Sequence, residues 1–182
     1  PIVVYGHKSP FMLVCFLACV KAGRAYCPVD LSMPHERIAA IIKKVGNDIA
    51  FATEEIPYEV EEAKLVDFIS TKEINEIIDD TCCASIKHGT TPGADSKKRC
   101  GVSVEKIGSE HWVKDDDVFY IIFTSGSTGE PKGVKISAAS LESFVGWMAG
   151  IAGEDGGTFL NQAPFSFDLS VMDLYTSLCT GG

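Results

Sequence analysis

Short strand-like runs alternate with helical patterns along most of this chain, and this alternation restricts the fold more than any other feature. The strand-like runs are apolar, short and rich in β-branched and aromatic residues. They cover residues 2–5, 24–29, 49–52, 64–68, 118–123, 134–136 and 158–161. Because strands that alternate with helices form βαβ units, we expect an α/β fold with a mostly parallel sheet flanked by helices on both faces.

Capping residues mark where the helices begin and end. Ser9 precedes Pro10, which suits the first helical position because no N–H is needed there, and Gly23 ends the same helix in a left-handed conformation. Ser32 and Pro34 open a second helix. Its apolar stripe consists of Ile38, Ile41, Ile42 and Val45. Further helices are expected over residues 71–79, from residue 138 onward, and over residues 169–178.

Charge excludes one class of partner. The 182 residues include 25 acidic and 16 basic ones, which gives a formal net charge of −9. An acidic chain without a basic stripe is poorly suited to DNA or RNA, although backbone amides can still hold a single nucleotide. The longest apolar run covers residues 11–20 and is too short to cross a bilayer, so no membrane span is expected.

Cysteine and histidine spacing gives no sign of a disulfide framework or a metal site. The seven cysteines are Cys15, Cys19, Cys27, Cys82, Cys83, Cys100 and Cys179, and none forms a C-x-x-C pair. We therefore interpret them as reduced thiols of a cytoplasmic protein, with Cys15, Cys19, Cys27 and Cys179 in the core. The four histidines lack partners at ligand spacing, so no metal-binding residue is assigned.

The middle and the ends of the chain suggest a part of a larger protein. Residues 81–117 are polar and lose the strand–helix pattern, so we expect a mobile loop segment there. The chain opens directly on a strand-like run and closes on a Gly-Gly turn signal. We expect residues 1–182 to form an incomplete N-terminal domain.

The strongest functional signal follows the buried run at residues 119–123. The next ten residues, TSGSTGEPKG, contain three glycines, four hydroxyl side chains and one lysine. Glycines let backbone N–H groups turn toward an anion, and hydroxyl and ammonium groups donate to phosphate oxygens. We expect a phosphate site formed by Thr124, Ser125, Gly126, Ser127, Thr128, Gly129 and Lys132. The spacing does not fit a Walker A motif, and the alternative is a flexible surface turn with a solvated lysine.

Three segments resemble one enzyme family. Residues 119–133 resemble the phosphate-binding motif of the adenylate-forming, AMP-binding superfamily, which includes acyl-CoA synthetases, luciferases and peptide-synthetase adenylation domains. Residues 17–30, LACVKAGRAYCPVD, resemble a structural segment of that family, and FSFDLS at residues 165–170 resembles its FDxS segment. The three lie in the family's order across nearly the whole chain.

Other segments resemble one branch of this superfamily. VYGH at residues 4–7, PVDLS at residues 28–32 and the stretch over residues 159–173 are similar to the ligases that activate D-alanine for a carrier protein. The resemblance implies that ATP and D-alanine form D-alanyl-AMP, with Mg²⁺ at the phosphates. The acyl group then passes to the phosphopantetheine thiol of a D-alanyl carrier protein, for D-alanylation of teichoic acid in the cell wall.

The resemblance also assigns residue roles. The phosphate site would hold the ATP triphosphate, and Asp168 would pair with the substrate ammonium, as its counterpart does in amino-acid-activating relatives. The alternative for Asp168 is a helix N-cap. No catalytic residue is assigned, because the family's later motifs, including the lid lysine, have no counterpart here, and we expect the chain alone to be inactive.

Two other functions remain open at this level. The first keeps the superfamily but changes the substrate, as in a peptide-synthetase adenylation domain for another amino acid or an acyl-CoA synthetase. The second is a non-catalytic α/β module that binds a different anion. Asp168 disfavours a fatty acid, because a fatty acid lacks the ammonium group with which this carboxylate would form a charge-assisted hydrogen bond.

Overall fold

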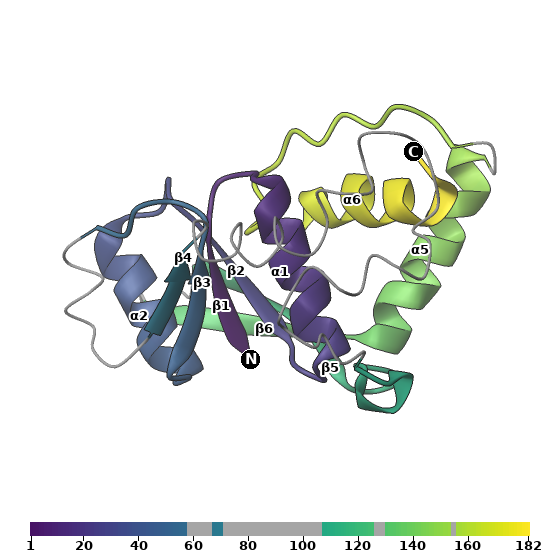
Figure 1. Cartoon of the computed structure of the whole chain (residues 1–182). Coiled ribbons are helices and arrows are strands. Elements are labelled where there is room, and N and C mark those ends of the chain that lie inside the picture. The colour runs from purple at the N-terminus through teal and green to yellow at the C-terminus, as the bar shows by residue number, and fades with distance from the viewer. Residues whose placement is uncertain (58–66, 71–106, 126–129, 154–155) are drawn as a thin grey trace, which may run out of the picture.

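The strands form a single sheet whose topology can be followed in Figure 1. The computed structural model describes residues 1–57, 67–70, 107–125, 130–153 and 156–182. The strands in these parts of the chain are β1 (Ile2–Gly6), β2 (Tyr26–Asp30), β3 (Ile49–Ala52), β4 (Asp67–Ser70), β5 (Val118–Ser125) and β6 (Pro131–Ser137). They lie in the order β4-β3-β1-β2-β5-β6. All pairs from β4 to β5 are parallel, and only the β5–β6 hairpin is antiparallel, so the expected mostly parallel sheet is confirmed.

Helices cover both faces of the sheet. The described helices are α1 (Pro10–Lys21), α2 (His35–Val45), the short 3₁₀ turn η2 (Ser109–His111), α5 (Ala138–Ala152) and α6 (Leu169–Thr180). One core cluster joins the sheet to α1, α5 and α6, and a second joins it to α2. Side chains of a strand point alternately to the two faces of the sheet. In β1, accordingly, Val4 belongs to the first cluster and Val3 and Tyr5 to the second. No helix in the described ranges is both long and apolar enough to cross a membrane.

The predicted boundaries of α1 are confirmed. The hydroxyl of Ser9 accepts a hydrogen bond from the backbone N–H of Phe11 at 3.2 Å. Gly23 has a φ of +70°, and a Cβ atom there would lie 2.5 Å from the carbonyl oxygen of His111. Only glycine satisfies both conditions without strain.

The start of α2 confirms the prediction for Pro34 but not for Ser32. Pro34, rather than Ser32, occupies the N-cap position, and no side chain caps this end of the helix. The backbone N–H and the hydroxyl of Ser32 both donate to the carboxylate of Asp30 instead. Ser32 is thus part of a cluster at the end of β2.

One predicted strand is wrong. Residues 158–161 form no ladder with any described strand, and the side chain of Leu160 is 82% exposed. The backbone carbonyls of Asn161 and Gln162 accept hydrogen bonds from the ammonium group of Lys8 instead of from a neighbouring strand. A short apolar run alone does not distinguish a strand from an extended surface segment.

Several sequence predictions lie wholly or partly outside the described residues. The expected helix at residues 71–79 and most of the polar segment at 81–117 belong to this group, as do Cys82, Cys83 and Cys100. Of the four cysteines expected in the core, Cys15, Cys19 and Cys27 are buried, whereas Cys179 is exposed. Cys179 lies in the last turn of α6, on a side of the helix that no described element covers.

Candidate functional site

The carboxyl ends of the parallel strands bring several polar side chains to one edge of the sheet. Strands β1, β2 and β5 are neighbours in the order β1-β2-β5 and run parallel, so Gly6, Asp30 and Ser125, which end them, lie toward the same edge. In open α/β sheets this edge is where ligands bind. The candidate site therefore lies where the fold alone would place it.

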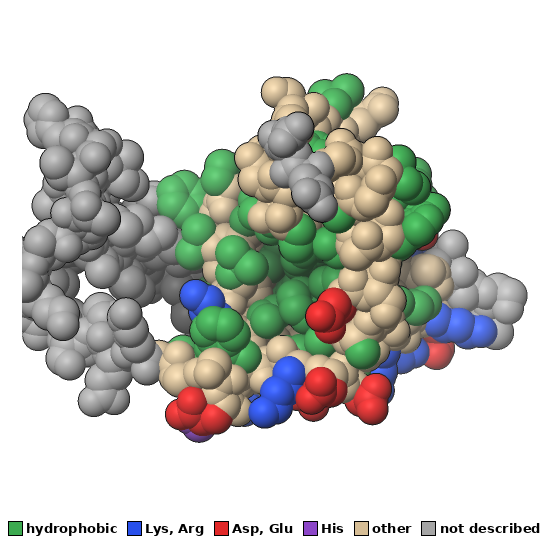
Figure 2. Space-filling view, turned by 90° about the vertical axis from the view of Figure 1, so that its right-hand side faces the viewer, with side chains coloured by type: hydrophobic (Ala, Val, Ile, Leu, Met, Phe, Trp, Pro, Cys, Tyr) green, Lys and Arg blue, Asp and Glu red, His purple; other side chains and the backbone are tan. Residues whose placement is uncertain are grey.

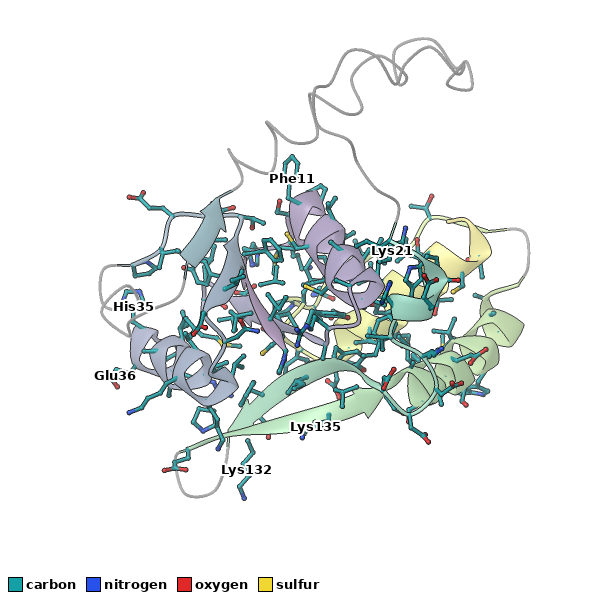
Figure 3. The ribbon with its side chains drawn as sticks, turned by 60° about the horizontal axis from the view of Figure 1, so that its bottom comes forward. Phe11, Lys21, His35, Glu36, Lys132 and Lys135 are labelled. Carbon is teal, nitrogen blue, oxygen red and sulfur yellow. The ribbon has the colours of Figure 1, made fainter. Side chains whose placement is uncertain are left out.

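The described part of the expected phosphate site is the stem of the β5–β6 hairpin. Thr124 lies opposite Lys132 and Ser125 opposite Pro131 in the antiparallel register. The hydroxyl of Thr124 donates to the carbonyl oxygen of Lys132 at 3.5 Å. Figure 3 shows the Lys132 side chain projecting away from the ribbon at the loop end of the hairpin. Gly126, Ser127, Thr128 and Gly129 lie outside the described residues, and of Ser125 only the backbone is described.

A pocket of about 670 Å³ lies beside this stem. Its floor is the face of the hairpin formed by alternate residues of β5 and β6, namely Tyr120, Ile122, Thr124, Val134 and Ile136. One wall comes from Met33, Pro34 and Arg37 at the start of α2, and the opposite wall from Ser166, Phe167 and Asp168 before α6. The pocket thus connects two of the sequence motifs, since it contains both Thr124 and Asp168.

Asp168 lies at the N-terminus of α6 and is exposed. Its Oδ1 atom accepts a hydrogen bond from the backbone N–H of Leu169 at 3.0 Å, so the N-cap interpretation is confirmed. Burial raises the pKa of the Tyr120 phenol to about 12, and the negative charge of Asp168 contributes to the increase. The Asp168 carboxylate therefore influences the ionisation of Tyr120, and both residues line the same pocket. Its role toward a substrate remains a prediction.

Arg37 is a pocket residue that the sequence did not reveal. The side chain of Phe167, which is 54% exposed, also lines the pocket beside Asp168. Arg37 donates from Nη2 to the carbonyl oxygen of Phe123 at 3.1 Å. It brings a positive charge to the wall opposite Asp168. The signal that could have found Arg37 is its place in the first turn of the helix that follows β2, because such helix starts lie at the ligand edge of the sheet.

A second polar cluster lies at the ends of β1 and β2. The Nδ1 atom of His7 is 2.8 Å from Oδ2 of Asp30, and the hydroxyl of Ser32 donates to Oδ1. Burial disfavours the charged form of Asp30, but the hydrogen bonds from Ser32 and His7 outweigh this and lower the pKa of the carboxyl group. Register explains the contact, because Gly6 pairs with Asp30. No group of three or more His, Cys, Asp or Glu side chains in the described ranges could hold a metal ion.

Figure 2 shows that apolar side chains gather on the face of the molecule that carries α5 and α6. Large exposed apolar residues on and near these helices include Trp147, Ile151, Leu160, Phe167 and Leu169. An isolated domain rarely exposes so many together. Phe167 belongs both to this exposed apolar region and to the lining of the pocket.

Comparison with known proteins places the chain among proteins of one family. The sequence profile described as "AMP-binding enzyme" matches residues 1–182. The D-alanine–D-alanyl carrier protein ligase of Listeria monocytogenes serotype 4b (strain CLIP80459) is 47% identical over 184 residues, which cover 100% of this chain and 32% of the relative. The ligase of the same name from Bacillus velezensis is 43% identical over 183 residues, covering 100% of this chain and 31% of the relative. The chain thus spans about a third of the length of these relatives.

Solved structures agree with the fold. The complex of VinN with L-aspartate superimposes with a TM-score of 0.76 at 16% identity, covering 99% of this chain and 42% of VinN. The N-terminal subdomain of Klebsiella oxytoca NpsA, in complex with 3-hydroxybenzoyl-AMSN, gives a TM-score of 0.68 at 20% identity, covering 99% of this chain and 39% of that chain. At this level of identity the likeness concerns the fold alone.

Proposed function

Because the chain belongs to the AMP-binding enzyme family, we propose that the protein that contains it is a ligase that activates D-alanine with ATP and transfers it to a carrier protein. The observation that carries this proposal is the pocket that Thr124 and Asp168 share. One pocket then offers donors for phosphate at one end and a carboxylate for an ammonium group at the other. The identity of 43–47% over the whole chain to D-alanine–D-alanyl carrier protein ligases supports the choice of substrate.

The proposed reaction has two steps. In the first, a carboxylate oxygen of D-alanine attacks the α-phosphorus of ATP, the bond between the α-phosphorus and the bridging oxygen breaks, and pyrophosphate leaves. In the second, the phosphopantetheine thiolate of the carrier protein attacks the acyl carbon, the bond between this carbon and the phosphate oxygen breaks, and AMP leaves as the thioester forms. Both steps depend on holding the reacting groups in line and on neutralising phosphate charge, rather than on a covalent enzyme intermediate.

We assign the phosphate groups of ATP to the hairpin and its loop. The assigned residues are Thr124, Ser125, Gly126, Ser127, Thr128, Gly129 and Lys132. The described stem supports this, because Thr124 and Lys132 are cross-strand neighbours and both side chains are exposed at the end of the hairpin. The described residues provide no metal cage, so Mg²⁺ would enter with the phosphates, as it commonly does.

We assign the substrate ammonium to Asp168. A carboxylate can accept several hydrogen bonds, and the N–H of Leu169 occupies only Oδ1. The same residue can therefore cap α6 and bind an ammonium group. Arg37 on the facing wall supplies a positive charge that suits the substrate carboxylate or a phosphate.

The biological setting follows from the same proposal. D-alanyl carrier proteins receive D-alanine for teichoic acid, so we place the protein in D-alanylation of the cell wall. Free buried thiols at Cys15, Cys19 and Cys27 favour a reducing compartment and thus the cytoplasm. We assign the activity to a longer protein than this chain, because the matching ligases are about three times as long.

A substrate panel tests the proposal. We expect the full-length protein to catalyse ATP–pyrophosphate exchange with D-alanine, and to do so at least about tenfold less efficiently with L-alanine or glycine, as a difference of about 1.4 kcal/mol in recognition would give. Octanoate should give no exchange, since it has no ammonium group for Asp168. Preference for a different amino acid would identify a peptide-synthetase-like enzyme instead. Binding of ATP without exchange for any carboxylate would favour a non-catalytic module.

A further inference from the structure

We propose that Lys8 is a positioning residue of the amino-acid pocket, whose ammonium group holds the segment from Asn161 to Asp168 in place. The proposal rests on the assignment of Asp168 to the substrate ammonium. Lys8 does not touch the pocket itself, and it acts through backbone groups of the segment that forms the wall around Asp168.

Lys8 joins parts of the chain that are far apart in sequence. It lies two residues after Gly6, the last residue of β1, and its ammonium donates to the carbonyl oxygens of Asn161 and Gln162, which are 153 and 154 positions away. Figure 1 shows why the contact can form, because the chain after α5 passes over α6 toward the end of β1 and the start of α1. Hydrogen bonds from a charged donor are stronger than those between neutral groups.

The backbone of Lys8 supports a specific role. Its φ of +45° lies in the left-handed region, which a lysine rarely adopts. Such a conformation costs free energy and persists only where surrounding contacts hold it. The two hydrogen bonds to the distant segment are contacts of this kind.

The beginning of the segment that Lys8 holds lies outside any strand ladder of the described residues, whereas Phe165 further along packs in the core. Residues 158–161 have no strand neighbour in the described parts of the chain, and the Oδ1 atom of Asn161 is buried there without a hydrogen-bond partner. Backbone carbonyls outside a ladder need donors from elsewhere. Lys8 provides donors for two consecutive carbonyls, so its loss would free the segment at the point where it begins its turn toward α6.

A chain of hydrogen bonds leads from this contact to Asp168. The Nδ2 atom of Asn161 donates to the carbonyl oxygen of Ser170 at 3.1 Å. The hydroxyl of Ser170, which is buried, donates in turn to the carbonyl oxygen of Phe167 at 2.7 Å. Asp168 lies between Phe167 and Ser170 in the sequence, so the orientation of its carboxylate depends on these two hydrogen bonds.

The first test is hydrogen exchange in the full-length protein. The N–H groups of Phe167, Ser170 and Val171 donate to backbone carbonyls within the turn, and they report on its order. In Lys8→Met we expect their exchange to accelerate by about tenfold, because the lost charged hydrogen bonds contribute on the order of 1.5 kcal/mol or more. Lys8→Arg retains the charged donors and should stay close to the original protein. Lys43→Met, which changes an exposed lysine of α2, is the matched control.

The second test separates positioning from a general structural role. In Lys8→Met the KM for D-alanine should rise about tenfold while the KM for ATP changes by less than about twofold. Equal rises in both KM values, or unchanged exchange of the three amides, would overturn the proposal. If the original protein shows no amino-acid-dependent activity, the proposed function fails, and the hydrogen-exchange comparison alone then decides whether Lys8 holds the segment.

Discussion

The phenol oxygens of Tyr26 and Tyr175 lie 2.6 Å apart and share a hydrogen bond inside the core. Tyr26 belongs to β2 and Tyr175 to α6, so this bond fixes α6, the helix that Asp168 caps, to the sheet. The ring of Tyr26 also stacks on Phe16 of α1, with the ring centroids 4.2 Å apart. The position of the pocket wall thus depends on a buried polar contact as well as on apolar packing.

Removing one of these hydroxyls should destabilise the protein more than removing both. In Tyr175→Phe the hydroxyl of Tyr26 stays buried without its partner, which costs about 1–3 kcal/mol of unfolding free energy. In the double variant with Tyr26→Phe no orphaned hydroxyl remains, so the loss should be clearly smaller than the sum of the two single losses. Urea denaturation of the four proteins measures this. Additive losses would show that the two hydroxyls act independently.

The Asp30 cluster should make stability depend on pH in the acidic range. Burial disfavours the carboxylate, but hydrogen bonds from Ser32 and His7 lower its pKa below the ordinary value of about 3.9. A pKa lowered in the folded state gives stability that is present above the ordinary value and is lost as the pH falls through the folded value. We expect the stability advantage over Asp30→Asn to shrink as the pH is lowered from 6 toward 3. A constant difference across this range would contradict the assignment.

The order of elements could be predicted because each parallel strand and each helix carries its own pattern. The stripe of Ile38, Ile41 and Ile42 predicted α2, and all three side chains are buried. The strand expected at residues 158–161 failed because a run of four residues carries no information about a neighbour to pair with. The partner of that segment, Lys8, lies about 150 positions away, and sequence patterning does not report contacts of that range.

Thiol reactivity should follow burial. Burial raises the pKa of Cys15 to about 11 and the pKa of both Cys19 and Cys27 to about 12. Because the thiolate is the reactive species, iodoacetamide at pH 8 should modify Cys179 and leave these three intact in the folded protein. Peptide mapping by mass spectrometry measures the modification of each site. Comparable labelling of Cys27 would show that β2 is not buried as described.

Two glycines should respond to alanine in opposite directions. Gly23 has a φ of +70°, and a Cβ there would approach the carbonyl oxygen of His111 to 2.5 Å. Gly23→Ala should therefore lower the thermal midpoint, through a loss of more than about 1 kcal/mol. Gly146 lies inside α5 with open space around its Cα, so Gly146→Ala should stabilise the protein by about 0.5–1 kcal/mol. Differential scanning calorimetry of both variants checks the pair, and similar shifts in the same direction would contradict this account of Gly23.

The site could be predicted only in part. The motifs predicted Thr124, Lys132 and Asp168 as candidate site residues, because residue types with a particular chemistry stand at fixed positions after a strand or before a helix. Arg37 was missed because an arginine in a first helical turn is ordinary in sequence. Its contact with the carbonyl oxygen of Phe123 exists only after α2 packs beside β5. The shared pocket of Thr124 and Asp168 likewise depends on tertiary packing.

The proposed role of Asp168 is to bind the ammonium group of D-alanine through its carboxylate, and Asp168→Asn in the full-length protein tests this role. Asparagine is as good a helix N-cap as aspartate, so the substitution removes the charge and keeps the cap. We predict that the KM for D-alanine in ATP–pyrophosphate exchange rises about tenfold to 100-fold, as loss of a charged hydrogen bond of about 1.5–3 kcal/mol would give. The control substitution Asp173→Asn, on the same helix, should leave the KM for D-alanine unchanged. An unchanged KM for D-alanine in Asp168→Asn would contradict the account.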